Sequence, residues 1–130
     1  MSTVIKIHQN HRFSLDEARS LLPVVRRVTQ RARGNYDLLG KRLEGGPQSP
    51  EQCSKIESEL NRTVVEWSEV IKRLGCEVRG LWIVDFDCGD GYFCWKCPEE
   101  ELLYFRGYNT GFSTRVLIES ISSHRVQNPS

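Results

Sequence analysis

Apolar residues recur at every third or fourth position over two long segments of the first half of the chain, which is the spacing of one face of an α-helix. The first segment begins at the capping box Ser14-Leu15-Asp16-Glu17. The second begins at Ser49-Pro50-Glu51-Gln52, where proline takes the first helical position, and Gly75 follows it as a terminator. Because the linker between the segments is short, the pattern predicts an antiparallel helical hairpin over residues 14–75.

After Gly75 the apolar period changes to two, and β-branched and aromatic residues accumulate. The predicted strands are Val78–Phe86, Tyr92–Cys97 and Leu102–Arg106. Residues 87–91 have the glycine and aspartate content of a hairpin turn, and residues 116–121 add a strand or a helical turn. The predicted fold class is therefore α+β: a long antiparallel helical hairpin packed on a small antiparallel β-meander, with the sheet within residues 77–121.

The chain length of 130 residues is typical of one domain. We expect residues 1–12 to form an N-terminal arm, although residues 3–7 alternate loosely and an edge strand is the alternative. Residues 13–121 form the single predicted domain, and residues 122–130 have the composition of a flexible tail.

The length of the predicted hairpin raises the question of what covers it. Helices of about 35–40 Å are longer than a sheet of three short strands can cover. The apolar stripe therefore favours a homodimer in which two hairpins form a four-helix arrangement. Pro23 lies inside the first helix, where it predicts a bend.

The charge balance gives no global attraction to polyanions, because the formal net charge is +1. The first residues lack a long apolar signal segment, and no run approaches the ~18 apolar residues of a membrane span. The five cysteines form an odd set. These features favour a soluble cytoplasmic protein with no membrane anchor.

Several short motifs occur in order along the chain. They are FSLDEA at 13–18, LLP at 21–23, LGCEV at 74–78, VDF at 84–86, FCWK at 93–96, and Gly111-Phe112 with Arg115. Together they resemble an uncharacterised bacterial family, domain of unknown function 2203, over Phe13 to Arg115.

The resemblance implies a helical hairpin followed by a small sheet, and it implies no assigned activity. Members of that family usually have a Trp-His pair where this chain has Phe105-Arg106, an acidic residue in place of Asn109, and a glycine in place of Thr114. The resemblance therefore implies that any catalytic or metal-binding role of that histidine is lost here, or that Arg106 has a changed role.

The cysteines suggest one candidate chemistry, a zinc site at Cys88, Cys94 and Cys97, because thiolates two residues apart form half of a zinc knuckle. A second CxxC pair is missing, and in a regular strand Cys94 and Cys97 point to opposite faces. We therefore favour no metal, with Cys94 as a small core residue and Cys97 as a partly exposed thiol.

A stripe of arginines is the second candidate. Arg19, Arg26 and Arg33 are spaced seven apart on one helical face, where they could neutralise phosphates of a nucleic acid. The second helix carries glutamates that antiparallel packing would bring near this stripe, namely Glu57, Glu59, Glu66 and Glu69. We favour this solvated ion-pair arrangement over nucleic-acid binding.

The third candidate is a polar loop beside the aromatic strands. Polar groups that converge next to aromatic rings can bind a small anion or a carboxylate. The candidate ligand-binding residues are Asp85, Trp95, Arg106, Asn109 and Arg115. The alternative is structural, with Arg115 paired to Asp85 or to a glutamate of residues 99–101. No residue is predicted to be catalytic, because no activated nucleophile or acid–base pair is evident.

Taken together, these patterns favour a non-enzymatic protein-interaction or scaffold module that acts as a dimer, with a protein partner still to be identified. A zinc-stabilised nucleic-acid-binding module is the first alternative. The second is a small-molecule enzyme that uses the region of Asp85, Arg106 and Arg115.

Overall fold

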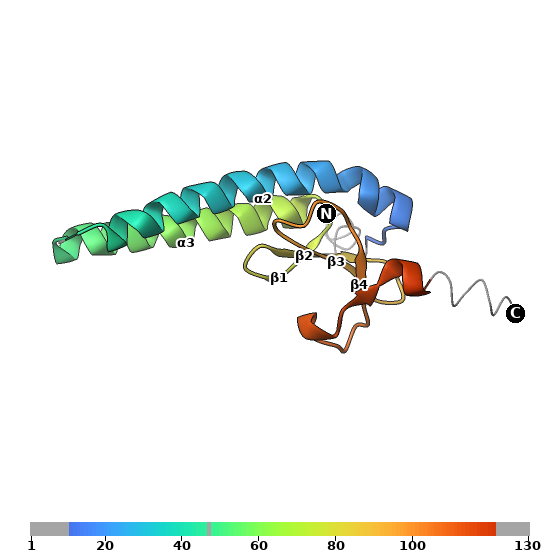
Figure 1. Cartoon of the computed structure of the whole chain (residues 1–130). Helices are drawn as coiled ribbons and strands as arrows, with labels where there is room; N and C mark the ends of the chain where they lie inside the picture. Colours follow the sequence, from blue (N-terminus) through green and yellow to red (C-terminus); the bar gives the residue numbers. More distant parts are fainter. Residues whose placement is uncertain (1–10, 47, 122–130) are drawn as a thin grey trace, which may run out of the picture.

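The computed structural model describes residues 11–46 and 48–121. The predicted arm before residue 11, with its alternative strand, and the predicted tail from residue 122 lie outside the described residues. The described chain has two layers, a hairpin of two long helices and a small sheet that packs under one part of it (Figure 1). This arrangement confirms the predicted α+β class.

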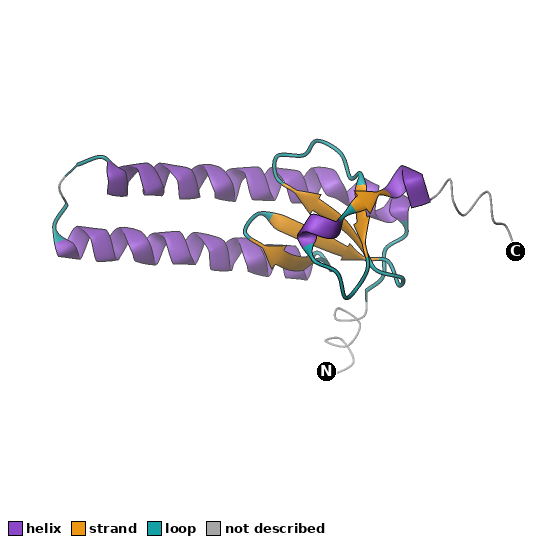
Figure 2. Ribbon diagram, turned by 60° about the horizontal axis from the view of Figure 1, so that its bottom comes forward, coloured by secondary structure: helices purple, strands orange, loops and turns teal. Residues whose placement is uncertain are grey.

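The hairpin consists of α2 (Leu15–Glu44) and α3 (Pro50–Arg73), which lie antiparallel and side by side (Figure 2). Both predicted capping boxes are present: Ser14 Oγ accepts from Glu17 N at 3.1 Å, and Ser49 Oγ accepts from Gln52 N at 3.1 Å. Gly75 has a φ of +92°, as its terminator position requires. α2 continues through Pro23 without a break, and Figure 1 shows its N-terminal end curved toward the sheet. No helix in the described part of the chain is long and apolar enough to cross a membrane.

The sheet is an antiparallel meander with the strand order β1-β2-β3-β4-β5. Its strands are β1 (Glu77–Gly80), β2 (Ile83–Asp87), β3 (Tyr92–Lys96), β4 (Tyr104–Arg106) and β5 (Val116–Leu117). A short 3-10 helix, η1 (Phe112–Thr114), precedes β5, and residues 118–121 are helical. The turn at residues 87–91 is confirmed, since Gly89 N donates to Asp87 Oδ1 at 2.9 Å.

The predicted single strand Val78–Phe86 is wrong, because the chain reverses inside it to form β1 and β2. Trp82 adopts a φ of +64° in the turn, and the register shifts between Val78 and Gly80. The Trp82 ring packs edge-on against Trp67 with a centroid distance of 4.9 Å and is 8% exposed. The alternating apolar pattern gives no information about this contact with another element. The packing of Trp82 in the folded chain therefore decides that the predicted strand is interrupted at this residue.

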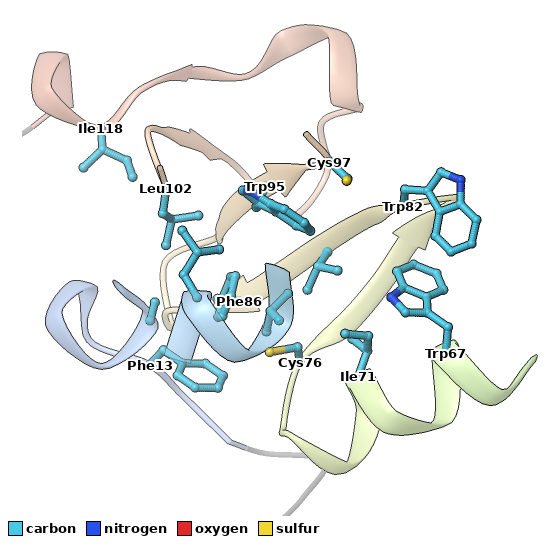
Figure 3. Packing of buried hydrophobic residues seen from close by; sticks show 14 residues of the cluster. Phe13, Trp67, Ile71, Cys76, Trp82, Phe86, Trp95, Cys97, Leu102 and Ile118 are labelled. Carbon is cyan, nitrogen blue, oxygen red and sulfur yellow. The ribbon is translucent and has the colours of Figure 1, made fainter. Parts of the chain in front are cut away.

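The hydrophobic core lies between the helices and one face of the sheet, here called the inner face (Figure 3). Val84, Phe86 and Trp95 project from this face and are fully buried. Trp67 Nε1 donates to Thr29 Oγ1 at 2.8 Å, which satisfies the two buried polar groups between the helices.

The arginine stripe of α2 lies against the loop between β3 and β4. Arg19, Arg26 and Arg33 donate to the backbone carbonyls of residues 102, 100 and 97, at 3.3, 2.9 and 3.3 Å. The predicted pairing of this stripe with the glutamates of α3 is therefore replaced by contacts to the loop. These bonds satisfy loop carbonyls and attach the loop to the helix.

Candidate functional site

The face of the sheet that points away from the helices, here called the outer face, carries polar side chains. Asp85 on β2 alternates with the inner-face residues Val84 and Phe86, and Cys94 on β3 is its register partner. Arg106 on β4 lies next to Tyr92 on β3 in the same register. The outer-face cluster, defined as Arg79, Asp85, Tyr92, Cys94 and Arg106, therefore follows from the two-residue period of four neighbouring strands.

An ion pair between Asp85 and Arg106 forms the centre of this cluster. Both side chains are about 1% exposed, and Arg106 Nη2 donates to Asp85 Oδ2. Arg79 Nε donates to the same oxygen at 3.1 Å. Arg106 Nη1 also donates to the carbonyl of Thr110 at 2.6 Å, and its guanidinium lies 4.6 Å from the centroid of the Tyr92 ring. The pair therefore also holds the loop that follows β4.

Two polar atoms of the ion pair have no nitrogen or oxygen partner among the described residues, namely Asp85 Oδ1 and Arg106 Nε. The neighbouring thiol of Cys94 is buried beside the Asp85 carboxylate. Burial, and secondly the negative charge of Asp85, raises the pKa of the Cys94 thiol to about 12. Cys94 is therefore protonated at neutral pH, and its S–H is a weak donor beside Asp85.

Arg115 forms a second ion pair at the edge of the outer face. Its Nη2 lies 2.9 Å from Glu99 Oε2, and its Nη1 donates to Glu99 Oε1 at 3.1 Å, so the contact is bidentate. The guanidinium lies 4.0 Å from the ring centroids of both Tyr104 and Phe112. This geometry matches the structural alternative predicted for Arg115, in which a glutamate of residues 99–101 is its partner.

The five predicted ligand-binding residues do not form one site. Asp85, Arg106 and Arg115 lie on or beside the outer face, where the charges of both arginines act on Cys94. Trp95 is buried on the inner face, where its Nε1 donates to the carbonyl of Glu99 at 2.7 Å. Asn109 is exposed in the turn after β4. The strand alternation separates Trp95 from the other residues, because adjacent strand residues point to opposite faces.

The three candidate zinc ligands are placed apart. Cys94 is on the outer face, whereas Cys97 belongs to the hydrophobic core, with its sulfur 3.6 Å from Arg33 Nη1. Cys97 is 4% exposed, so the prediction of a partly exposed thiol is wrong. Cys88 lies in the β2–β3 turn, where its thiol donates to the carbonyl of Gly91 at 3.3 Å. Within residues 11–46 and 48–121, no group of three or more His, Cys, Asp or Glu side chains is placed to hold a metal ion.

Sequence reasoning missed Arg79 and Tyr92 as members of the cluster, although the two-residue alternation of the strands places both on the same face as Asp85. Arg79 and Asp85 both lie at outward positions of their strands, and β1 pairs with β2. The information needed was the turn at Trp82, which turns Arg79 back toward Asp85.

A separate pocket of about 270 Å³ lies at the N-terminus of α2 and was also not predicted. Its apolar wall includes Phe13, Phe93, Phe105 and Ile118, and Cys88 and Asp90 line it as well. The residues that form it come from distant parts of the chain, so no local motif indicates it.

A comparison with protein families finds one that covers most of the chain. The family model described as "Uncharacterized conserved protein (DUF2203)" matches residues 11–118. No curated protein and no solved structure gives a match. The matched residues include the helical hairpin, the strands and the outer-face cluster, and the chain therefore belongs to the DUF2203 family of uncharacterised conserved proteins.

Proposed function

We propose that the protein is a non-enzymatic protein-interaction or scaffold module that acts as a homodimer through its helical hairpin. The observation that carries this proposal is the overhang of the hairpin: its closed end extends well past the sheet, which packs only near the open end (Figures 1 and 2). Leu38 is 63% exposed there. Helices that project from a small core usually bury such surface against another chain.

The chemistry of the polar residues supports a binding role over catalysis. Arg106 and Arg115 are engaged by Asp85 and Glu99, so their charges are used within the chain. Burial raises the pKa of the Cys76 thiol to about 12, as it does for Cys94, and it also raises the pKa of Cys88. Thiols with raised pKa values are poor nucleophiles near neutral pH.

A cytoplasmic location is part of the same proposal. All five cysteines lie within the described residues, and none forms a disulfide. Reducing compartments maintain free thiols, whereas small secreted domains typically use cysteines in disulfides.

The test is sedimentation equilibrium of the full chain from about 1 to 100 μM, a range typical of moderate protein affinities. The expected result is a mass of two chains at the upper concentrations, with the monomer increasing on dilution. A monomer throughout this range would contradict the homodimer. The same preparation, purified without chelators under reducing conditions, is analysed for metal. About one zinc per chain, together with salt-dependent nucleic-acid binding, would replace the proposal with the zinc-stabilised alternative.

A further inference from the structure

A groove runs along the hairpin on the side opposite the sheet. Arg31 lies half a turn round α2 from the buried residue Leu22, at about 100° per residue, and therefore points away from the core. Two adjoining hollows of about 290 and 500 Å³ lie between α2 and α3 on this side. Apolar positions line their floor and walls, namely Val28, Ala32, Leu38, Leu39, Trp67 and Val70.

The two rims of the groove differ in charge. α2 contributes Arg31 and Arg42, whereas α3 contributes Glu66 and Glu59, with one cation, Arg62, beside Glu59. Among the ion pairs of the described residues, none involves Arg31, Arg42, Glu59 or Glu66. The basic rim and the acidic rim are therefore both available to a partner at the same level of the hairpin.

We propose that this groove is the dimer interface, and that its occupant is a second copy of the chain with α2 of each copy seated on α3 of the other. The inference rests on the homodimer proposed above and specifies its surface and symmetry. Rotation by 180° about an axis parallel to the helices places each α2 over the partner's α3 without changing its level. Arg31 then faces Glu66 of the second copy. Arg42 reaches toward Glu59, which lies about 7 Å nearer the open end and lines the same hollow.

The alternative two-fold axis crosses the helices at right angles and places α2 on α2. It brings the basic rims together and the acidic rims together, which like-charge repulsion disfavours. The open end of the groove agrees with the first arrangement. There Asp16 and Glu17 begin α2, whereas Lys72 and Arg73 end α3, so the charges of facing helices are again opposite.

The size of the face is adequate for a stable dimer. Leu21 lies on the same side of α2 as Val28 and Arg42, because the three are spaced by multiples of seven residues. From Leu21 to Arg42, α2 rises about 32 Å, and two neighbouring helices are about 20 Å across, which gives a footprint of about 600 Å². Standard interfaces use about 800 Å² of accessible surface from each partner, and accessible surface exceeds a flat footprint. The sheet packs on the opposite side of the hairpin and does not obstruct this contact (Figure 2).

The experiment uses charge reversal in the full chain, with dimerisation followed by sedimentation equilibrium. Arg31→Glu and Glu66→Arg each replace two attractive contacts per dimer by two repulsive ones, so each variant is expected to raise the dimer Kd about tenfold or more. Glu57→Arg is the matched control, because Glu57 is exposed and lies half a turn round α3 from Glu66. Its Kd is expected to equal that of the wild type.

Mixing the two variants is the decisive step. A heterodimer of the Arg31→Glu chain with the Glu66→Arg chain has opposite charges at both contacts, so an equimolar mixture is expected to regain the wild-type Kd within about threefold. A pairing of Arg31 with Glu66 inside one chain cannot produce this recovery. The pair Arg42→Glu and Glu59→Arg repeats the test at the adjoining hollow if either first variant fails to fold by circular dichroism.

The outcomes separate the groove from the proposed function. A wild-type dimer whose Kd is unchanged by Arg31→Glu and Glu66→Arg overturns the groove interface and leaves the homodimer. Weakened variants that do not recover on mixing overturn it as well. A monomeric wild type overturns both.

Discussion

Each face of the sheet buries side chains, but different interactions stabilise those side chains on the two faces. The inner face buries Val84, Phe86 and Trp95 against the helices, where burial itself is favourable. The outer face buries Asp85 and Arg106, for which removal from water is costly and only pairing offsets the cost. The comparison shows that similar burial has different consequences on the two faces. On the inner face one apolar side chain can replace another, whereas on the outer face each charged residue needs its partner.

The largest expected effect is on the inner face. Trp95→Ala removes a fully buried indole and leaves a cavity, so the free energy of unfolding is expected to fall by about 3–5 kcal/mol. Urea denaturation followed by circular dichroism measures the change. Leu103→Ala is the control, since Leu103 is 40% exposed and follows the buried residue Leu102. A loss below about 1 kcal/mol for Trp95→Ala would mean that the inner face can collapse around the missing ring.

On the outer face, the effect depends on whether both partners change. Asp85→Leu leaves the Arg106 guanidinium buried without its partner, and the expected loss is about 3 kcal/mol. The double variant Asp85→Leu with Arg106→Met removes both charges, so its stability is expected to return to within about 1 kcal/mol of the wild type. Additive losses, measured by the same denaturation, would show that loop contacts such as Arg106 to Thr110 contribute more than the ion pair does.

One buried thiol lies on each side of the sheet, so the stability of both faces is expected to depend on pH. Cys76 belongs to the inner core and Cys94 to the outer face, and burial raises both pKa values from 9.0 to about 12. Above pH 9 the unfolded chain loses these protons while the folded chain keeps them, so stability falls as pH rises toward 12. The expected slope is up to about 1.4 kcal/mol per pH unit for each thiol.

The measurement compares the wild type with Cys76→Ala and Cys94→Ala under reducing conditions at several pH values between 8 and about 11. Each variant is expected to lose less stability per pH unit than the wild type at alkaline pH. All other titrating groups are common to the variant and the wild type, so their contributions cancel when the two are compared. A slope unchanged by Cys94→Ala would indicate that its thiolate is tolerated beside Arg106 and Arg115.

The smallest expected effect concerns the loop between β3 and β4, which the arginines of α2 contact. Arg26→Gln shortens a side chain whose Nη1 donates to the carbonyl of Glu100, and the expected loss is about 1 kcal/mol. Arg27→Gln on the exposed neighbouring position is the control. Equal stability of the two variants would mean that Arg26 contributes no more than an ordinary surface side chain.

The helices were predictable from the sequence because their signals are local. Capping boxes at Ser14 and Ser49 and the terminator Gly75 each act within one turn, and the apolar stripe identifies the buried side without reference to the rest of the chain. The break at Trp82 was not predictable, because the position of its ring depends on Trp67 in another element.

The sequence alone determined the α+β class, the hairpin and the turn after β2, since each depends on residues within a few positions of one another. The tertiary structure decided which of these residues meet. It separated Trp95 from Asp85, paired Asp85 with Arg106 and Arg115 with Glu99, and placed the arginines of α2 against loop carbonyls. Such pairings depend on strand register and on helix–sheet packing, and these are set by burial of the whole core, which no short segment specifies.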